Sequence, residues 1–181
     1  MFRARLVAGA LVACLSIACS SSDGPHKSAL EESRSVWRGL VAMNGETYSY
    51  AVETSSFSGS ATRTLLQFEP GAELEPAVAT YRGFEVATPT PEGARGPLVL
   101  QWEERGAEIG SHPDGAPADT VDVLYDRCAR DVLTKDPKLN DISLEFDDAG
   151  ILRLCSYFPR GCQDDCSVGV LISDLQFGKT Y

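Results

Sequence analysis

The sequence of 181 residues is poor in histidine, with only His26 and His112, and it contains only two methionines. Two histidines provide few general bases and few metal ligands. Basic residues are also scarce, because 16 Lys and Arg face 26 Asp and Glu, which gives a net charge of −10. A protein that neutralises phosphates needs the opposite balance, so we expect no nucleic-acid partner.

Common catalytic motifs are absent as well. The chain has no Gly-x-Ser-x-Gly, no His-Glu-x-x-His and no glycine-rich phosphate loop. His112 lies beside Ser111 and near Asp114, but neighbouring residues in a Pro-Gly turn do not converge as a catalytic triad requires. We therefore interpret residues 110–115 as a solvated turn. The sequence predicts no catalytic residue and no cofactor.

The longest hydrophobic run, Leu6–Ala18, is shorter than the roughly 20 residues that a membrane-spanning helix needs. It follows Arg3 and Arg5, and a polar segment rich in serine begins directly after Cys19. This order is typical of a secretory signal peptide. We therefore expect residues 1–18 to be removed on export.

The end of the run resembles the lipobox of bacterial lipoproteins, in which small residues precede a cysteine that is acylated. Cys14 follows the better box, with Leu11 three residues before it, whereas Cys19 has Ser16 at that position. We prefer Cys19 because cleavage there leaves a longer apolar segment and an even number of cysteines in the mature chain. Lipidation at Cys19, with acyl chains such as palmitate, would anchor the protein to a membrane.

The mature chain reads as a flexible linker over 19–27 and one domain over 28–181. Apolar residues recur at helical spacing after the capping box Ser28–Glu31, and an Asn-Gly pair ends the pattern, which predicts a helix over 29–43. A second helix is expected to begin at Asp119 and to end before Pro137. Alternating apolar residues and turn signals predict strands over 47–54, 62–68, 77–86, 98–102, 142–146, 151–158 and 168–177.

These elements predict an α+β fold: an antiparallel sheet of about five to seven strands packed by one or two helices, with two disulfides. Trp37 on the first helix, Tyr48-Ser49-Tyr50 at the start of the first strand, and Val121–Tyr125 before a closing hairpin resemble a family of uncharacterised bacterial lipoproteins. The resemblance covers about residues 30–177. It implies the fold and an envelope location, and it implies no chemistry.

Four cysteines remain in the mature chain, at positions 128, 155, 162 and 166. In an exported protein they predict two disulfides. Cys128–Cys155 with Cys162–Cys166 would join the second helix to the sheet and close a short loop. Cys155–Cys166 with Cys128–Cys162 is the alternative, if Arg160-Gly161 forms a tight turn. A zinc site is disfavoured, because only Cys162 and Cys166 have the spacing of a metal-binding pair.

Other candidate ligand sites have simpler interpretations. The pairs Asp147-Asp148 and Asp164-Asp165 lack the calcium-loop pattern, and aspartate is common in hairpin turns for its local hydrogen bonds. Trp37, Trp102, Tyr48 and Tyr50 could line a groove, but aromatic residues on strands and helices are usually core. We expect no metal site.

If the domain binds a partner through its surface, we expect the long segment 87–118 to form the binding site; the alternative is a solvated insertion with no role. The segment is rich in proline, and its short strand near Trp102 could offer a sheet edge. We also expect residues 88–97 and 111–117 to be removable with little loss of thermal stability.

Together, the sequence predicts a non-catalytic lipoprotein of the bacterial cell envelope that acts as a binding or scaffolding module. The alternative is an envelope hydrolase with dispersed acidic residues. Ser20, rather than aspartate, follows Cys19 and resembles the pattern of outer-membrane lipoproteins. The expected partners are the membrane, through the lipid anchor, and an envelope protein.

Overall fold

The computed structural model describes residues 24–181 except 57–58, 71–78, 93, 165 and 179. Along the chain, the elements are α1 (Pro25–Asn44), β1 (Tyr48–Ser55), β2 (Ala61–Phe68), β3 (Ala79–Ala87), β4 (Val99–Arg105), η1 (Gly106–Glu108), α2 (Val121–Arg127), η2 (Cys128–Val132), β5 (Asn140–Phe146), β6 (Leu152–Pro159) and β7 (Val168–Phe177). The signal segment 1–18 and Cys19 lie outside the described residues.

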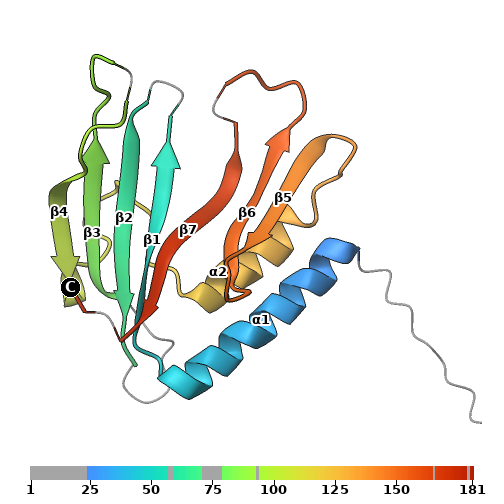
Figure 1. The fold of residues 1–181 in the computed structure, drawn as a ribbon, viewed down its shortest axis with the longest axis horizontal. Helices are drawn as coiled ribbons and strands as arrows, with labels where there is room; N and C mark the ends of the chain where they lie inside the picture. Colours follow the sequence, from blue (N-terminus) through green and yellow to red (C-terminus); the bar gives the residue numbers. More distant parts are fainter. Residues whose placement is uncertain (1–23, 57–58, 71–78, 93, 165, 179) are drawn as a thin grey trace, which may run out of the picture.

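The seven strands form one antiparallel sheet in the order β4-β3-β2-β1-β7-β6-β5 (Figure 1). The fold class predicted from the sequence is confirmed. Two consecutive meanders are joined because β7 returns to the centre of the sheet and pairs with β1, with Tyr48 opposite Phe177. The strand near Trp102, β4, lies at one edge.

Both helices contribute to one core on one face of the sheet. Alternate residues of β1 point to this face, so Tyr48 and Tyr50 are buried at 4% and 1% exposure. Trp37 of α1 packs edge-on against Tyr48, and Val121 and Leu124 of α2 belong to the same cluster. Trp37, Tyr48 and Tyr50 are therefore core residues, as the sequence predicts.

A smaller cluster covers the opposite face. It contains Ala51, Leu65 and Tyr81, with the ring of Tyr181 stacked on Tyr81 at 5.2 Å between centroids. Gly83 makes this arrangement possible, because a Cβ atom there would lie 2.2 Å from the Tyr81 hydroxyl oxygen. The C-terminal residue thus packs against the sheet face that the helices leave free.

The first helix begins earlier than expected. It starts at Pro25, whose fixed backbone angle suits the first turn, and Gly24 precedes it. Ser28 and Glu31 therefore lie inside the helix and do not form its cap, and the linker expected over 19–27 is wrong for residues 25–27. The C-terminal end agrees with the prediction, since Gly45 has φ 88° and its N–H bonds to the Val41 carbonyl at 2.8 Å.

The second helix is capped by Thr120, not by Asp119. The Thr120 hydroxyl accepts a hydrogen bond from the Val123 N–H, whereas the Asp119 carboxylate pairs with Arg127. After Arg127 the helix widens into one π-helical turn, in which the Leu133 N–H bonds to the Cys128 carbonyl at 3.0 Å. The apolar pattern continues through this change and does not reveal it.

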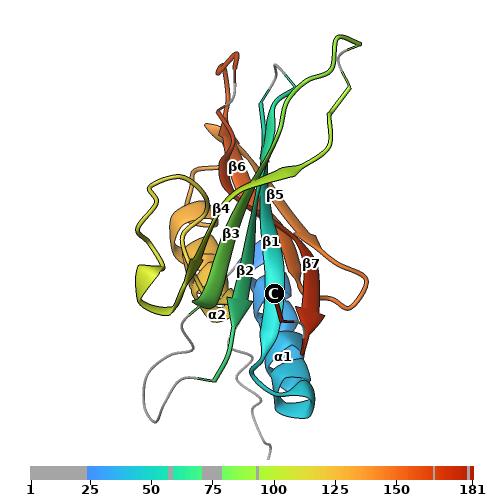
Figure 2. The same ribbon diagram turned by 90° about the vertical axis from the view of Figure 1, so that its left-hand side faces the viewer.

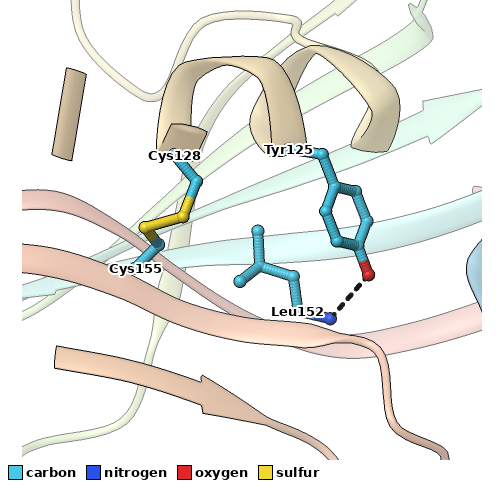
Figure 3. The surroundings of a disulfide bond; sticks show 4 residues. All are labelled: Tyr125, Cys128, Leu152 and Cys155. Atoms are coloured by element: carbon cyan, nitrogen blue, oxygen red, sulfur yellow. Dashed lines mark hydrogen bonds between the residues drawn. A yellow bond between two sulfur atoms is a disulfide. The ribbon is translucent and has the colours of Figure 1, made fainter. Parts of the chain in front are cut away.

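Two disulfides stabilise the second half of the chain. Cys128–Cys155 joins η2 to β6, and Cys162–Cys166 lies in the connection between β6 and β7. The first of the two predicted pairings is the one found, and the alternative with Cys155–Cys166 is wrong. Figure 3 shows the first bond beside Leu152, whose N–H donates to the Tyr125 hydroxyl at 3.0 Å.

Candidate functional site

A cavity of about 730 Å³ opens on the face of the sheet that carries the helices. Its floor consists of residues from β1, β2, β6 and β7. One wall is the α2–η2 segment, and the other includes Gly115, Ala116 and Pro117 from the connection after β4. In the edge-on view of Figure 2, that connection and α2 lie on the same side of the sheet.

The cavity exists because the strands extend beyond the helices. On β1 the residues that share this face pass from buried Tyr50 through half-buried Val52 to exposed Thr54. The neighbouring strand places Thr64 opposite Val52 and Thr62 opposite Thr54. The uncovered part of the face is therefore lined by methyl groups and hydroxyl groups.

The buried disulfide forms the inner end of the cavity. Cys128 and Cys155 are 2% and 0% exposed, and both line the cavity. Val170, which lies opposite Cys155 on β7, continues the apolar floor toward Val168 at the open end. Because this bond holds η2 to β6, it fixes the separation between wall and floor.

The outer rim of this wall is charged. Arg127 pairs with Asp119, and Arg130 pairs with Asp131 at 2.7 Å. The mutual hydrogen bond of Arg130 and Asp131 raises the pKa of the guanidinium and lowers the pKa of the carboxyl, so both stay charged. The fifth charged group, Lys135, lies with its Nζ 4.8 Å from the centroid of the Tyr157 ring.

A buried ion pair positions the opposite wall. Arg82 and Glu104, with side chains 5% and 1% exposed, form an ion pair with 3.0 Å between Nε and Oε2. Arg82 also donates to the carbonyls of His112 and Asp114. Because these bonds tie residues 110–114 to β3 and β4, the Gly115–Pro117 wall that follows is held in place.

Glu104 is ionised despite its burial. Desolvation by burial disfavours the charged form, but hydrogen bonds from the N–H groups of His112 and Gly110 and from the side chains of Ser111 and His112 outweigh it and lower the pKa to about 2. Hydrogen bonds to an ionised carboxylate are stronger than those between neutral groups, so Glu104 holds the loop against the sheet.

Residues 110–115 are exposed and form turns, as the sequence predicts, but their hydrogen bonds to Glu104 and Arg82 also tie them to the sheet. We therefore expect that shortening 111–117 lowers stability, in contrast to the expectation from the sequence.

Ser111, His112 and Glu104 are close together but do not form a catalytic triad. The Ser111 hydroxyl donates to Glu104 at 2.9 Å, and His112 Nδ1 lies 3.1 Å from the same oxygen. A triad needs serine on one ring nitrogen and the acid on the other. Here the Ser111 hydroxyl and the Glu104 carboxylate both contact the same ring nitrogen of His112, Nδ1. The His112 ring also stacks on Trp102 at 4.6 Å between centroids, so the arrangement is structural.

Two further hydrogen bonds join the walls to the floor. The Ala116 N–H donates to the Thr64 hydroxyl at 2.9 Å, and the Tyr50 hydroxyl donates to the Asp119 carbonyl. Gly115 lies against the Trp102 ring with φ 88°, so a side chain there would be both strained and crowded. Part of segment 87–118 thus lines the cavity.

The remaining candidate residues of the sequence lie elsewhere. Asp147 accepts hydrogen bonds from the N–H groups of Ala149 and Ile151, which confirms its role in a hairpin turn. Asp165 lies outside the described residues. In the described ranges, no three His, Cys, Asp or Glu side chains come together as metal ligands would, and no helix is long and apolar enough to cross a membrane.

Among the residues that line the cavity, only Tyr50 and the part of segment 87–118 at Gly115–Pro117 were binding candidates from the sequence. In the sequence, nothing distinguishes Thr54, Thr62 and Thr64 from other strand residues. Nothing distinguishes Lys135 from other lysines near the end of a helix. One signal for the threonines was available in the sequence. Residues two positions apart on a strand share a face, so the threonines of β1 and β2 lie on the same face as the buried aromatic residues of these strands.

Comparison of the chain with protein-family models, with curated proteins and with solved structures gives no match. The resemblance to a lipoprotein family, carried by Trp37 and the Tyr48–Tyr50 segment, therefore stays a prediction. Function is therefore inferred from the geometry of the cavity itself.

Proposed function

We propose that the protein is an exported, lipid-anchored binding module of the bacterial envelope, and that the cavity beside α2 is its binding site. The location rests on the sequence before residue 20, with Cys19 as the acylated residue. Attachment at the outer membrane and an envelope protein as a partner belong to the same proposal.

The observation that carries this proposal is a cavity whose walls are fixed on both sides. Its volume of about 730 Å³ is within the range of small-molecule sites, about 300–1,000 Å³. The disulfide Cys128–Cys155 holds one wall, and the buried pair Arg82–Glu104 holds the other. A preformed site avoids much of the ordering cost that otherwise weakens binding.

The lining residues favour binding over catalysis. Both carboxylates, Asp119 and Asp131, are engaged with arginines, and both cysteines are joined to each other. Hydroxyl groups at Thr54 and Thr62 and the cations at the rim can orient a ligand. A hydrolase would need a nucleophile paired with a base, and the described lining residues include no histidine.

The test is recovery of a natural ligand. The full chain is expressed with its export segment, purified from the envelope and denatured, and the released small molecules are measured by mass spectrometry. Two variants are compared with the wild type: Thr54→Trp fills the open end of the cavity, and Ser55→Trp places the same ring on the opposite face of the same strand. Both positions are exposed, so both variants should fold.

A compound that accompanies the wild type and Ser55→Trp, but is lost from Thr54→Trp, would support the cavity as the binding site. Equal recovery from all three proteins, or no compound from any of them, would contradict the proposed site.

A further inference from the structure

We propose that the cavity takes a single-chain amphiphile with one anionic headgroup, with the chain on the valine-lined floor and the anion at Lys135. This inference rests on the proposed function and names its class of ligand. It follows from the order of the lining along the cavity, from apolar interior to charged rim.

The interior fits a hydrocarbon chain. Val52 of β1 and Val170 of β7 lie on the floor, and Leu124 and Val132 lie on the helical wall. Leu124 and Val132 are 3% and 5% exposed, so their side chains belong to the core and the cavity continues it. A hydrocarbon chain that covers this surface would be stabilised because its methylene groups are removed from water.

The rim of the cavity carries one more cationic group than it has carboxylates. It carries Arg127, Arg130 and Lys135, and the two arginines are paired with the two carboxylates of the rim. Among the described residues, no carboxylate lies within 4.0 Å of Lys135, which acts on Asp131 only at longer range. Its half-buried side chain lies over the Tyr157 ring. A single added anion would balance the charge of the rim.

The contrast with the rest of the molecule strengthens this assignment. The chain as a whole carries a net charge of −10, so most of its surface repels anions. An excess positive charge at the mouth of an apolar cavity is a local exception. Partial burial also makes a charge-assisted hydrogen bond from Lys135 stronger than one on an open surface.

The headgroup can be a carboxylate or a phosphate, because a lysine ammonium binds either as a point charge. Isothermal titration calorimetry with dodecanoate and with dodecyl phosphate distinguishes a carboxylate headgroup from a phosphate headgroup. Dodecyltrimethylammonium and dodecanol supply the same chain with a positive head and with a neutral head. The three ionic probes are used below their micelle concentrations and dodecanol below its solubility limit, on protein purified from cells that express the full chain.

We expect at least one of the two anions to bind about tenfold more tightly than dodecanol and dodecyltrimethylammonium, because only the anions can accept a charge-assisted hydrogen bond from Lys135. Lys135→Met should abolish that preference for the anion, while Lys138→Met, at an exposed lysine outside the cavity, should retain it. Thr54→Trp should weaken all four probes.

The remaining outcomes separate the two proposals. Equal binding of all four probes, lost in Thr54→Trp, would overturn the anionic headgroup and leave the cavity as a binding site. Failure of every probe, with a compound still recovered from the envelope in a Thr54-dependent manner, would overturn the amphiphile. Failure of every probe and no recovered compound would overturn both proposals.

Discussion

The hydroxyl of Ser33 lies 2.7 Å from the hydroxyl of Tyr125, at the point where the two helices meet. Ser33 donates its proton to the Gly150 carbonyl at 2.7 Å, so Tyr125 must be the donor between the two hydroxyls. Tyr125 in turn accepts from the Leu152 N–H. One chain of three hydrogen bonds thus connects α1, α2 and the hairpin of β5 and β6. Figure 3 shows one of them, from Leu152 to Tyr125, next to the Cys128–Cys155 bond.

Removal of the Tyr125 hydroxyl tests this chain. Tyr125→Phe should lower the free energy of unfolding by about 1–3 kcal/mol, because the Leu152 N–H would stay buried without its acceptor. Urea unfolding followed by circular dichroism provides the measurement. Tyr157→Phe, at a half-buried ring beside Lys135, is the matched control and should change stability by less than about 0.5 kcal/mol. Equal losses in both variants would contradict the role of the chain.

The two disulfides should differ in their contribution to stability. Their sequence separations are 27 and 4 residues. In the chain-entropy treatment these separations correspond to about 3.5 and about 2 kcal/mol. Replacing Cys128 and Cys155 together by alanine should therefore lower the melting temperature more than replacing Cys162 and Cys166. The reverse order in a thermal melt would show that the longer link does not hold η2 to β6.

Acid should weaken the loop held by Glu104. The pKa of Glu104 is about 2 in the folded protein against an ordinary value of 4.5, so the unfolded chain binds the proton first as the pH falls. The stabilisation is complete above about pH 4.5 and is lost as the pH falls from there toward 2. Urea unfolding between pH 5 and pH 2 should show this loss.

Glu104→Gln is the control for that pH dependence. The variant leaves Arg82 buried without its counter-charge, which costs about 3–5 kcal/mol at neutral pH. Its stability should also fall less steeply below about pH 4.5, because the titrating group is gone. An unchanged slope in the variant would show that other carboxylates govern the acid response.

Membrane attachment should depend on Cys19. Cys19→Ala should release the protein from the membrane fraction or leave an uncleaved precursor, because the acylated residue is lost. Cys14→Ala should leave attachment intact. Fractionation of cells followed by immunoblotting is the measurement. Loss of attachment in Cys14→Ala, with normal attachment in Cys19→Ala, would move the lipid to the other cysteine.

The fold was largely accessible from the sequence because local periodicity decided most of its elements. The alternation after Thr47 predicted β1, and the prediction for β7 over 168–177 agrees with the structure at both ends. Such features depend on residues that are close in the sequence, so the hydrophobic pattern of a single segment predicts them. The pairing of Cys128 with Cys155 was one of two that the sequence left open, and the structure decides between them.

The cavity could not be predicted from the sequence, because it is formed by contacts between segments that are distant in the chain. It depends on how far the strands extend beyond α2 and on a loop held by Glu104 of β4 and Arg82 of β3. Ser111 and His112 looked like part of a solvated turn, since nothing local reveals that a buried carboxylate lies beneath them. Contacts between distant segments determine the site, and periodicity within a segment does not report them.

Amide NMR of the isotope-labelled protein, recorded during titration with dodecanoate, tests most directly whether the cavity is the binding site. The account predicts that the largest shift changes occur at Thr54, Thr62 and Lys135, which surround its opening. Largest changes instead around Phe146 and Ser173, which line a separate depression of about 300 Å³, or no changes at all, would contradict it.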